Sequence, residues 1–391
     1  MKPHELPAVV LAAGEGRRLA PLTDTRPKPM LSVANRPILE YVLEAIADAG
    51  TTEVYLVVGY QQERIRNHFG DGVDWDVDIT YVEQSPQLGT GHAIAQVEEH
   101  LDGPFLVFNG DRIVNASIAA DVAAAYEPDG AAVAVTVARH PSTFGVVEVR
   151  GDRLVAVEEK PLDPSPRATI NAGVYAFDGS IFDELRSVEP IDGEQTITAA
   201  LQAMAETERV SAVRYEGRWL DITHLWDIPA VTNLLVSEGE ATWIDRASVA
   251  ESASLATDVA VGAAARVESN ATVGGGTALG PSVTVGATAV VENSVVLADA
   301  TIGPGAVVRD AVIGANASVG ANATIGGGDA SVIVEGVVHD DVTLGGVVGD
   351  NASIGHGATL SAGSLVGTGA RIDDGVAASG RIPNNAEVRR G

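Results

Sequence analysis

Apolar residues in the first part of the chain, up to about Ser237, fall into short runs separated by stretches with helical spacing. Short apolar runs bounded by turn residues predict buried strands. The runs that we interpret as strands are residues 8–11, 54–58, 79–82, 105–108, 132–137 and 174–177. Residues 37–49 place Leu39, Val42 and Ile46 on one face and predict a helix. This alternation predicts an α/β domain with a Rossmann-like, mostly parallel sheet.

From about Ile244 onward, aliphatic residues recur at every sixth position. The positions with this spacing are Val249, Leu255, Val261, Val267, Val273, Leu279, Val285, Val291 and Leu297. The spacing slips by one at Ile302 and Ile313, continues through Val319 and Ile325, and resumes from Val348 to Ile372. Three such hexads would build one triangular coil of a parallel β-helix with the aliphatic side chains inside. A β-sandwich would alternate with a period of two, so the pattern disfavours it.

This change of pattern divides the chain into two predicted domains, residues 1–240 and residues 241–391. The repeat resembles that of the hexapeptide-repeat, left-handed β-helix family and covers most of residues 244–382. Proteins of that family are usually trimers. The resemblance therefore implies a homo-oligomer, with a trimer formed through the β-helix as the expected assembly.

The first predicted strand runs into a loop in which Gly14 and Gly16 stand where backbone N–H groups can bind phosphate. A dinucleotide-binding turn would require a third glycine at position 19, which is Leu19. A P-loop would require a lysine and a hydroxyl residue directly after its last glycine, and arginines stand there instead. The loop therefore predicts a phosphate site of another kind.

Taken whole, residues 14–23 (G-x-G-x-R-L-x-P-L-T) and residues 26–31 (R-P-K-P-M-L) resemble the signature of the sugar-1-phosphate nucleotidyltransferases, or sugar-nucleotide pyrophosphorylases. The resemblance implies a Mg²⁺-dependent enzyme that joins a nucleoside triphosphate to a sugar 1-phosphate and releases pyrophosphate. Fixed cations must stabilise the leaving pyrophosphate, and Arg17 and Lys28 would supply this catalytic charge.

The nucleotide site implied by the resemblance includes a second segment, residues 83–93, which reads EQSPQLGTGHA. The side-chain amide of Gln84 both donates and accepts, so it suits N3–H and a carbonyl of uracil or thymine. The segment LGTGHA is most similar to the corresponding segment of the N-acetylglucosamine-1-phosphate uridylyltransferases. The sequence does not decide whether the nucleotide is UTP or dTTP. The nucleotide-binding residues expected from the resemblance are Leu11, Ala12, Gly14, Gly16, Gln84, Gly89 and Thr90.

Two aspartates match the metal-binding positions of the family. Asp111 ends the apolar run FLVFNGD, at a strand end where open α/β sheets bind ligands. Asp221 lies in a stretch that resembles the family's W-x-D-x-G segment, with Thr223 in place of the glycine. Magnesium commonly takes one or two protein carboxylates and completes its octahedron with phosphate oxygens and water. The resemblance therefore implies Mg²⁺ at Asp111 and Asp221.

The segments around residues 144–145, 157–161 and 170–175 resemble the sugar-phosphate site. Lys160 would bind the phosphate of the sugar. Glu159 or Glu158, together with Asn171, would bind hydroxyl groups of a hexose, because carboxylates and amides accept hydrogen bonds from them. Gly145 would form the turn after Phe144. The pattern leaves glucose, galactose and their amino derivatives open.

Composition narrows the function further. The formal net charge of −28, from 53 acidic and 25 basic residues, disfavours nucleic-acid and anionic-membrane binding and suits a halophilic protein. Without cysteine, thiolate metal sites and cysteine nucleophiles are excluded. With no apolar run of about 20 residues and no pattern of a signal peptide, we expect a cytoplasmic protein. Lys2, Lys28 and Lys160 are the only lysines, so the two interior ones are candidates for function.

The repeat region leaves a second activity open. Hexapeptide β-helices are often acyltransferases, and in bifunctional uridylyltransferase/acetyltransferases lysines and a tyrosine of this region bind the acceptor. Residues 241–391 contain His339 and His356 but no lysine or tyrosine, so we favour an oligomerisation scaffold. A non-catalytic nucleotide-sugar sensor is a third interpretation. It is disfavoured because Arg17, Lys28 and Asp111 are all present.

Overall fold

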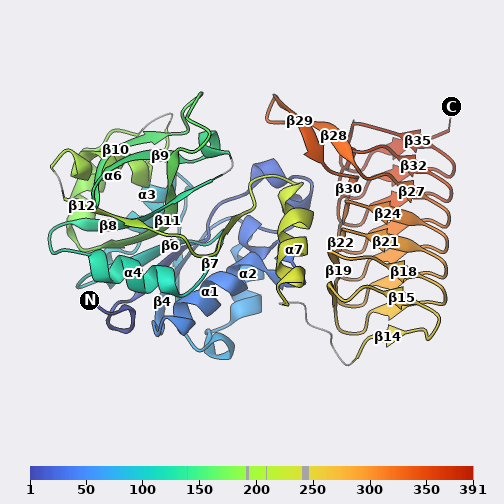
Figure 1. Ribbon diagram of the computed structural model, residues 1–391, viewed down its shortest axis with the longest axis horizontal. Coiled ribbons are helices and arrows are strands. Elements are labelled where there is room, and N and C mark those ends of the chain that lie inside the picture. The colour runs from blue at the N-terminus through green and yellow to red at the C-terminus, as the bar shows by residue number, and fades with distance from the viewer. Residues whose placement is uncertain (139, 191–192, 208, 240–245, 391) are drawn as a thin grey trace. The chain divides into compact units, whose positions relative to one another are not determined.

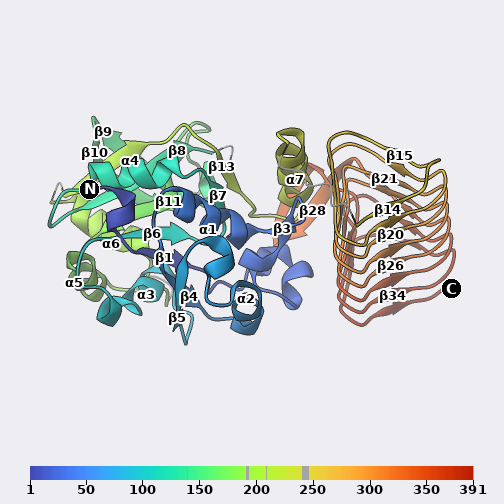
Figure 2. The ribbon, with the colours of Figure 1, turned by 90° about the horizontal axis from the view of Figure 1, so that it is seen from below.

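The computed structural model describes residues 1–138, 140–190, 193–207, 209–239 and 246–390 (Figures 1 and 2). The chain separates into two compact units. The first consists of Met1–Glu15, Pro27–Met30 and Ile38–Asp221, and the second of Gly16–Arg26, Leu31–Pro37 and Ile222–Gly391. The predicted boundary at residues 240 and 241 and the predicted start of the repeat at Ile244 lie outside the described residues. No helix among the described residues is long and apolar enough to cross a membrane.

A nine-stranded sheet forms the centre of the first unit. Its strands, in spatial order, are β5 (Asp78–Glu83), β4 (Glu53–Val58), β1 (Ala8–Leu11), β6 (Phe105–Asn109), β11 (Thr169–Phe177), β8 (Ala131–Val137), β12 (Val210–Arg214), β10 (Arg153–Glu159) and β9 (Gly145–Arg150). Each strand predicted from the apolar runs is present, and the predicted first helix is α1 (Ile38–Asp48). The Rossmann-like prediction is confirmed.

The sheet is mixed, which corrects the expectation of a mostly parallel one. Strands β5, β4, β1 and β6 run parallel to one another, as predicted. Strand β11 runs antiparallel to both β6 and β8, and β9 and β10 form an antiparallel pair. Apolar runs show where strands occur, whereas the direction of each strand depends on the connection that precedes it.

Helices cover both faces of this sheet. Along β1, Ala8 and Val10 are fully buried on one face and Val9 on the other. The first face packs against α1, α2 (Gln62–Phe69) and α4 (Ser117–Ala125). The second packs against α3 (Thr90–Ala95), α5 (Ser180–Ser187) and α6 (Ile197–Ala205). Because both faces are buried, the carboxyl ends of the central strands are the natural place for a ligand.

Three parallel sheets of very short strands form most of the second unit, consistent with the predicted left-handed β-helix. The first sheet contains β14 (Ser248–Val249), β17 (Arg266–Val267), β20 (Thr284–Val285), β23 (Thr301–Ile302), β26 (Ser318–Val319), β31 (Ser353–Ile354), β34 (Arg371–Ile372) and β37 (Glu387–Val388). The second contains β15 (Ser254–Leu255), β18 (Thr272–Val273), β21 (Val290–Glu292), β24 (Val307–Arg309), β27 (Thr324–Ile325), β32 (Thr359–Leu360) and β35 (Ala377–Ala378). The third contains β16 (Val259–Val261), β19 (Thr277–Leu279), β22 (Val295–Val296), β25 (Val312–Ile313), β30 (Val347–Val348), β33 (Leu365–Val366) and β36 (Arg381–Ile382).

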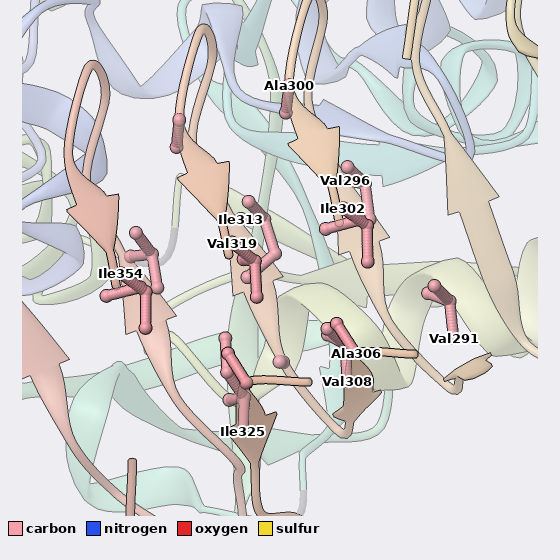
Figure 3. Close-up of a cluster of buried hydrophobic side chains, with 14 of the residues drawn as sticks. Val291, Val296, Ala300, Ile302, Ala306, Val308, Ile313, Val319, Ile325 and Ile354 are labelled. Atoms are coloured by element: carbon pink, nitrogen blue, oxygen red, sulfur yellow. The ribbon is translucent and has the colours of Figure 1, made fainter. Parts of the chain in front are cut away.

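Aliphatic side chains from all three sheets stack inside the coils, as the repeat predicted (Figure 3). The first slip of the period lies one repeat earlier than predicted. Val296, rather than Leu297, pairs with Leu279 and points into the core. The turn between Val291 and Val296 is one residue shorter than its neighbours, and the six-residue spacing alone placed the shortening after Leu297.

A hairpin interrupts the repeat between β27 and β30. The sequence pattern showed a break between Ile325 and Val348 but did not predict the hairpin. It consists of β28 (Asp329–Val334) and β29 (Val337–Thr343), which pair in antiparallel fashion. The rings of His339, His224 and Trp226 lie against one another, with centroids 4.4 to 5.1 Å apart. His339 is therefore part of an aromatic cluster within the second unit.

Several non-repeat elements belong to the same unit. Helix α7 (Asp227–Ser237) adjoins the third sheet of the β-helix. Strand β2 (Ser32–Val33), which pairs with β3 (Arg36–Pro37), packs against α7. The Asn35 side chain donates a hydrogen bond to the carbonyl of Leu279 over 2.8 Å. The Asn233 side chain donates to that of Asn293 over 3.0 Å. These contacts fix the turn at Asn35 and helix α7 to the coils.

The turn glycines of the β-helix explain part of its high glycine content. A Cβ atom on Gly303 would lie 2.7 Å from the backbone nitrogen of Ala321 in the next coil. We expect Gly303→Val to lower the free energy of unfolding by about 3 kcal/mol, because the coils cannot separate without losing ladder hydrogen bonds. The equivalent turn position after Val267 already holds the exposed side chain of Glu268. Thermal unfolding should show a large loss for Gly303→Val and little change for Glu268→Val; equal losses would contradict this packing argument.

Candidate active site

The carboxyl ends of β1 and β6 lie next to each other in the first unit. These strands are parallel, and the N–H of Gly110 donates a hydrogen bond to the carbonyl of Leu11 over 2.9 Å. Ala12 continues from this strand end and donates its N–H to the carbonyl of Val57. Asp111 follows Gly110 directly, so a predicted metal ligand lies beside the predicted nucleotide-binding backbone.

Three of the predicted functional side chains meet at this edge. Short strands β7 (Arg112–Val114) and β13 (Trp219–Asp221) pair in antiparallel fashion and bring Asp221 opposite Arg112. The ammonium nitrogen of Lys28 lies 2.5 Å from Oδ2 of Asp111 and 3.9 Å from Oδ1 of Asp221. Residues 28, 111 and 221, far apart in sequence, therefore form one charged cluster.

Arg112 completes the cluster, and sequence reasoning missed it. Its Nη1 lies 3.2 Å from Oδ1 of Asp111 and forms an ion pair with Asp221. The guanidinium also lies over the rings of Phe144 and Trp219, with Cζ 5.3 and 5.6 Å from their centroids. The sequence did contain a signal for Arg112, because it directly follows the predicted metal ligand Asp111. A cation next to a carboxylate lowers the pKa of that carboxylate.

The electrostatics of the cluster favour the ionised form of Asp111. Burial alone would raise the pKa of Asp111, but the charges of Arg112 and Lys28 outweigh burial and hold this pKa well below its usual range. The pKa of Arg112 is raised, because the attraction of Asp111 and Asp221 outweighs the cost of burial. The two carboxylates and two cations therefore balance in formal charge.

The donor set suits magnesium. Asp111 and Asp221 share the contacts of a single Arg112 nitrogen and of Lys28, so their oxygens face a common volume. Within the described part of the chain, no group of three or more His, Cys, Asp or Glu side chains could hold a metal. A pair of carboxylates without further protein ligands is what Mg²⁺ commonly uses when phosphate oxygens supply the rest.

The predicted base-recognition residues also lie together. Gln84 is only 4 % exposed, and its Nε2 donates to the carbonyl of Gly89 over 2.9 Å and lies 3.1 Å from Nδ1 of His92. Gly89 has a φ of +97°, and a Cβ there would lie 2.5 Å from the carbonyl oxygen of Gln195, so glycine is required. Thr90 begins α3 and accepts a hydrogen bond from the backbone of residue 197. His92 was not predicted.

Gln87 is a further residue that the sequence analysis missed. Its side chain donates to the carbonyl of Ala13 over 2.7 Å. Residue 87 belongs to the predicted base segment, and Ala13 lies in the predicted phosphate loop. This hydrogen bond joins the two parts of the nucleotide site.

Most of the predicted sugar-phosphate residues lie at the β9–β10 pair. Gly145 and Glu159 face each other in the register of these strands. The N–H of Lys160 donates to the carbonyl of Phe144 over 3.1 Å, and its Nζ lies 3.3 Å from Oε1 of Glu159. Half of the Lys160 side chain is exposed. Gly145, Glu159 and Lys160 thus lie together, and the Lys160 side chain is accessible to solvent.

Asn171 has a structural role that the sequence did not reveal. Its amide donates to the hydroxyl of Tyr175 over 2.7 Å and accepts from the N–H of Gly173 over 2.9 Å. Burial raises the pKa of Tyr175, so the hydroxyl stays neutral. The indole of Trp219 donates to the carbonyl of Ala172 over 2.8 Å. That bond connects the sugar segment to β13, which carries Asp221.

Gly14 belongs to the first unit, whereas Gly16 and Arg17 belong to the second. The carbonyl of Gly16 accepts from the hydroxyl of Thr23 over 3.0 Å, and Arg17 begins the short helix η2 (Arg17–Leu19). The motif G-x-G-x-R, counted from Gly14, places its arginine at position 18. Arg18 is therefore a second candidate for the phosphate-binding cation, and the assignment of Arg17 stays a prediction.

Comparison with known proteins shows the family of the chain. The family model for nucleotidyl transferases matches residues 7–237, more than half of the chain. The chain belongs to this family, as its sequence signature predicted. A second model, for the GMPPB C-terminal domain, matches residues 255–346.

Relatives are found among sugar-nucleotide enzymes. The chain is 38% identical to the bifunctional protein GlmU of Methanococcus maripaludis over 234 residues, which cover 59% of this chain and 54% of that protein. It is 37% identical to glucose-1-phosphate thymidylyltransferase of Streptomyces antibioticus, covering 60% of this chain and 67% of the relative. The low-salt glycan biosynthesis nucleotidyltransferase Agl11 of Haloferax volcanii is 33% identical, and the match covers 63% of this chain and 73% of that protein. The chain spans about half the length of the GlmU proteins that it matches.

Solved structures share the fold of the first part of the chain. A putative glucose-1-phosphate thymidylyltransferase from Bacillus anthracis superimposes with a TM-score of 0.54 at 22% identity, covering 59% of this chain and 94% of that one. A UDP-glucose pyrophosphorylase complexed with UDP-glucose gives a TM-score of 0.53 at 23% identity, and the match covers 60% of this chain and 99% of that one. At these identities the likeness concerns the fold alone.

Proposed function

We propose that this chain condenses UTP or dTTP with a hexose 1-phosphate, such as glucose 1-phosphate or N-acetylglucosamine 1-phosphate, to give a nucleotide sugar and pyrophosphate. The observation that carries the proposal is the cluster of Lys28, Asp111 and Asp221 at the carboxyl ends of β1 and β6. A nucleotidyl transferase needs cations and metal-binding carboxylates at one place, and this cluster provides both.

The reaction is a single displacement. An oxygen of the sugar 1-phosphate attacks the α-phosphorus of the triphosphate, the bond from that phosphorus to the bridging oxygen breaks, and pyrophosphate leaves with the bonding electron pair. No protein nucleophile is required, so positioning and charge stabilisation supply the acceleration. Asp111 and Asp221 would hold Mg²⁺, which neutralises phosphate charge when bound.

Lys28 and an arginine of the first loop, Arg17 or Arg18, stabilise the charge that develops on the leaving pyrophosphate. In the structure Lys28 is paired with Asp111. We infer that Lys28 turns from this carboxylate to the phosphates when the triphosphate binds, because phosphate oxygens then compete for its ammonium group. Arg112 keeps its contacts with both aspartates and so holds them in place.

The remaining residues select the substrates. The hydrogen bonds of the Gln84 amide within the described part of the chain involve Nε2, so we assign Oε1 to the N3–H of a uracil or thymine. Lys160 binds the phosphate of the sugar, and Glu159 binds its hydroxyl groups. Asn171 contributes through its contacts with Tyr175 and Gly173, which shape the sugar segment.

The experiment is a measurement of pyrophosphate release. The protein, kept in strong salt because of its net charge of −28, is incubated with Mg²⁺, each nucleoside triphosphate and a panel of hexose 1-phosphates. We expect release with UTP or dTTP and formation of the matching nucleotide sugar by mass. Omitting Mg²⁺ should abolish release. If every combination released no more pyrophosphate than enzyme-free controls, the proposed activity would be wrong.

Three further expectations accompany this function. A nucleoside triphosphate substrate is consistent with a cytoplasmic protein, and the acidic composition with a halophilic one. The β-helix is consistent with a homo-oligomer. Size-exclusion chromatography with light scattering tests the oligomeric state directly, with a trimer as the expected result.

A further inference from the structure

A buried carboxylate in the β-helix contacts the first loop of the chain. Asp350 lies in the turn between β30 and β31 and is 3 % exposed. Its Oδ2 accepts hydrogen bonds from the hydroxyl of Thr25 and from Nη2 of Arg26. The side chains of Arg26 and Asp350 are 10% and 5% exposed, so this ion pair is largely shielded from water. Thr25, Arg26 and Asp350 are called the Asp350 clamp below.

The β-helix itself uses only one of these two oxygens. Oδ1 of Asp350 accepts from the N–H of Ala315 in the preceding coil over 2.8 Å. Asp374, at the same step of the turn between the first and second sheets, accepts from the N–H of His356 over 2.7 Å, and it is exposed. Asn384, in the coil beyond Thr368, accepts from the N–H of that residue over 3.0 Å. One side-chain oxygen of an Asp or Asn is enough to accept the backbone N–H in these turns. The turn therefore does not explain why residue 350 is charged and buried.

The same face of the β-helix holds other residues of this loop. The Asn384 side chain donates to Oδ2 of Asp24 over 2.8 Å, and the Thr368 hydroxyl lies 3.4 Å from the carbonyl of Pro21. Residues 16–26 accordingly belong to the second compact unit, although the residues on either side of them belong to the first. The loop is therefore fixed to the coils at several points, of which the Asp350 clamp is the most buried.

We propose that Asp350 is a positioning residue of the nucleotidyl transferase reaction, and that the β-helix acts through the Asp350 clamp to hold the triphosphate-binding loop. This inference rests on the proposed function. Arg17 and Arg18 lie on the loop that the clamp fixes, and Lys28 follows Arg26 by two residues. The β-helix thereby becomes part of the catalytic machinery, in addition to any role in assembly.

The physical reason is preorganisation. A loop that is held in place before binding loses little conformational entropy when the triphosphate arrives, and its cations need no rearrangement to meet the phosphates. A small displacement of such groups can cost up to about 100-fold in rate. Arg26 would also be left as a buried cation without a counterion if Asp350 lost its charge, which would drive the loop away from the coils.

The test compares Asp350→Asn and Arg26→Gln with wild type in the full-length protein. Asn should preserve the turn, because Asn384 already fills an equivalent position. We expect each variant to raise the KM for the nucleoside triphosphate about 10-fold or more, while the KM for the sugar 1-phosphate stays within about twofold. The double variant should be no worse than either single variant, because both remove the same pair. Asp374→Asn is the matched control and should leave both constants unchanged.

A second readout separates this inference from the proposed function. Amide hydrogen exchange of residues 16–26, measured without substrates, should rise in Asp350→Asn and Arg26→Gln and stay unchanged in Asp374→Asn. Unchanged exchange and unchanged triphosphate KM in the clamp variants would overturn the inference. Equal rises in KM for both substrates would also overturn it, since a general loss of structure predicts that result. A wild-type protein without activity would refute the proposed function, and the exchange measurement would still decide whether the clamp orders the loop.

Discussion

Asp111→Asn is expected to lower kcat at least about 100-fold while the fold survives. Asn has nearly the shape of Asp, but it lacks the charge that a magnesium ion requires of its ligand. The substitution also leaves Lys28 and Arg112 with one carboxylate, Asp221, in place of two. Pyrophosphate release at saturating substrates measures the effect, and the loss should be only partly recovered at high Mg²⁺.

The matched control for this prediction is Asp78→Asn. Asp78 is an exposed residue at the start of β5, and its neutralisation should leave kcat unchanged. Circular dichroism and thermal unfolding should show that Asp111→Asn retains the native fold. Turnover near the wild-type value in a well-folded Asp111→Asn protein would dismiss the metal-binding role of this residue.

Arg112→Gln should change the pH dependence of the reaction. Arg112 and Lys28 hold the pKa of Asp111 below its usual range, so the carboxylate stays ionised as the pH falls through about 4, the ordinary value for aspartate. Removing Arg112 raises this pKa. The acid limb of kcat/KM should therefore move to higher pH, and kcat at neutral pH should fall about 10- to 100-fold as the aspartates lose their alignment.

The same substitution should affect stability with a definite sign. Because the folded-state pKa of Asp111 is depressed, its ion pairs stabilise the fold above the unfolded-state pKa, and this contribution is lost as the pH falls through the folded-state value. At neutral pH, Arg112→Gln removes one cation from a largely buried cluster and should cost about 3 kcal/mol. The pH range in which acid destabilises the protein should move to higher pH, because the substitution raises the folded-state pKa of Asp111.

Arg150→Gln is a suitable control for Arg112→Gln. Arg150 forms an ion pair with Glu148, but both side chains are mostly exposed, at 76% and 58%. Its removal should change neither the pH profile nor the thermal stability by a measurable amount. If the acid limb of Arg112→Gln coincided with that of wild type, Arg112 would not control the ionisation of Asp111.

Local sequence patterns predicted six strands of the nine-stranded sheet and the coils of the β-helix. The apolar runs at residues 8–11 and 105–108 became β1 and β6, because a fully buried strand leaves a continuous apolar signal. The six-residue spacing predicted the coils, and it failed only where a turn is shorter by one residue, at Val296. The hairpin of β28 and β29 was missed because an insertion carries its own alternation and interrupts the spacing.

Resemblance to the family motifs identified several candidate site residues that secondary-structure propensity alone could not have identified. Lys28, Asp111 and Asp221 were assigned from separate segments, and the structure brings them within 4 Å. The sequence analysis did not find the residues that contact these side chains and hold them in position. Arg112 approaches Asp221 only through the pairing of β7 with β13, and Asn171 is committed to Tyr175 and Gly173. Such contacts depend on strand pairing and packing between distant segments, which no local pattern contains.

The sequence by itself determined the classes of element, the inward aliphatic positions and the chemical types of the candidate groups, because these follow from short-range periodicity and from side-chain chemistry. The tertiary structure decided how those groups are charged and held. Only folding places two cations against Asp111 and lowers its pKa. Only folding brings Arg26 to Asp350, 324 positions away, because the free energy of burying an ion pair depends on which segments exclude water together.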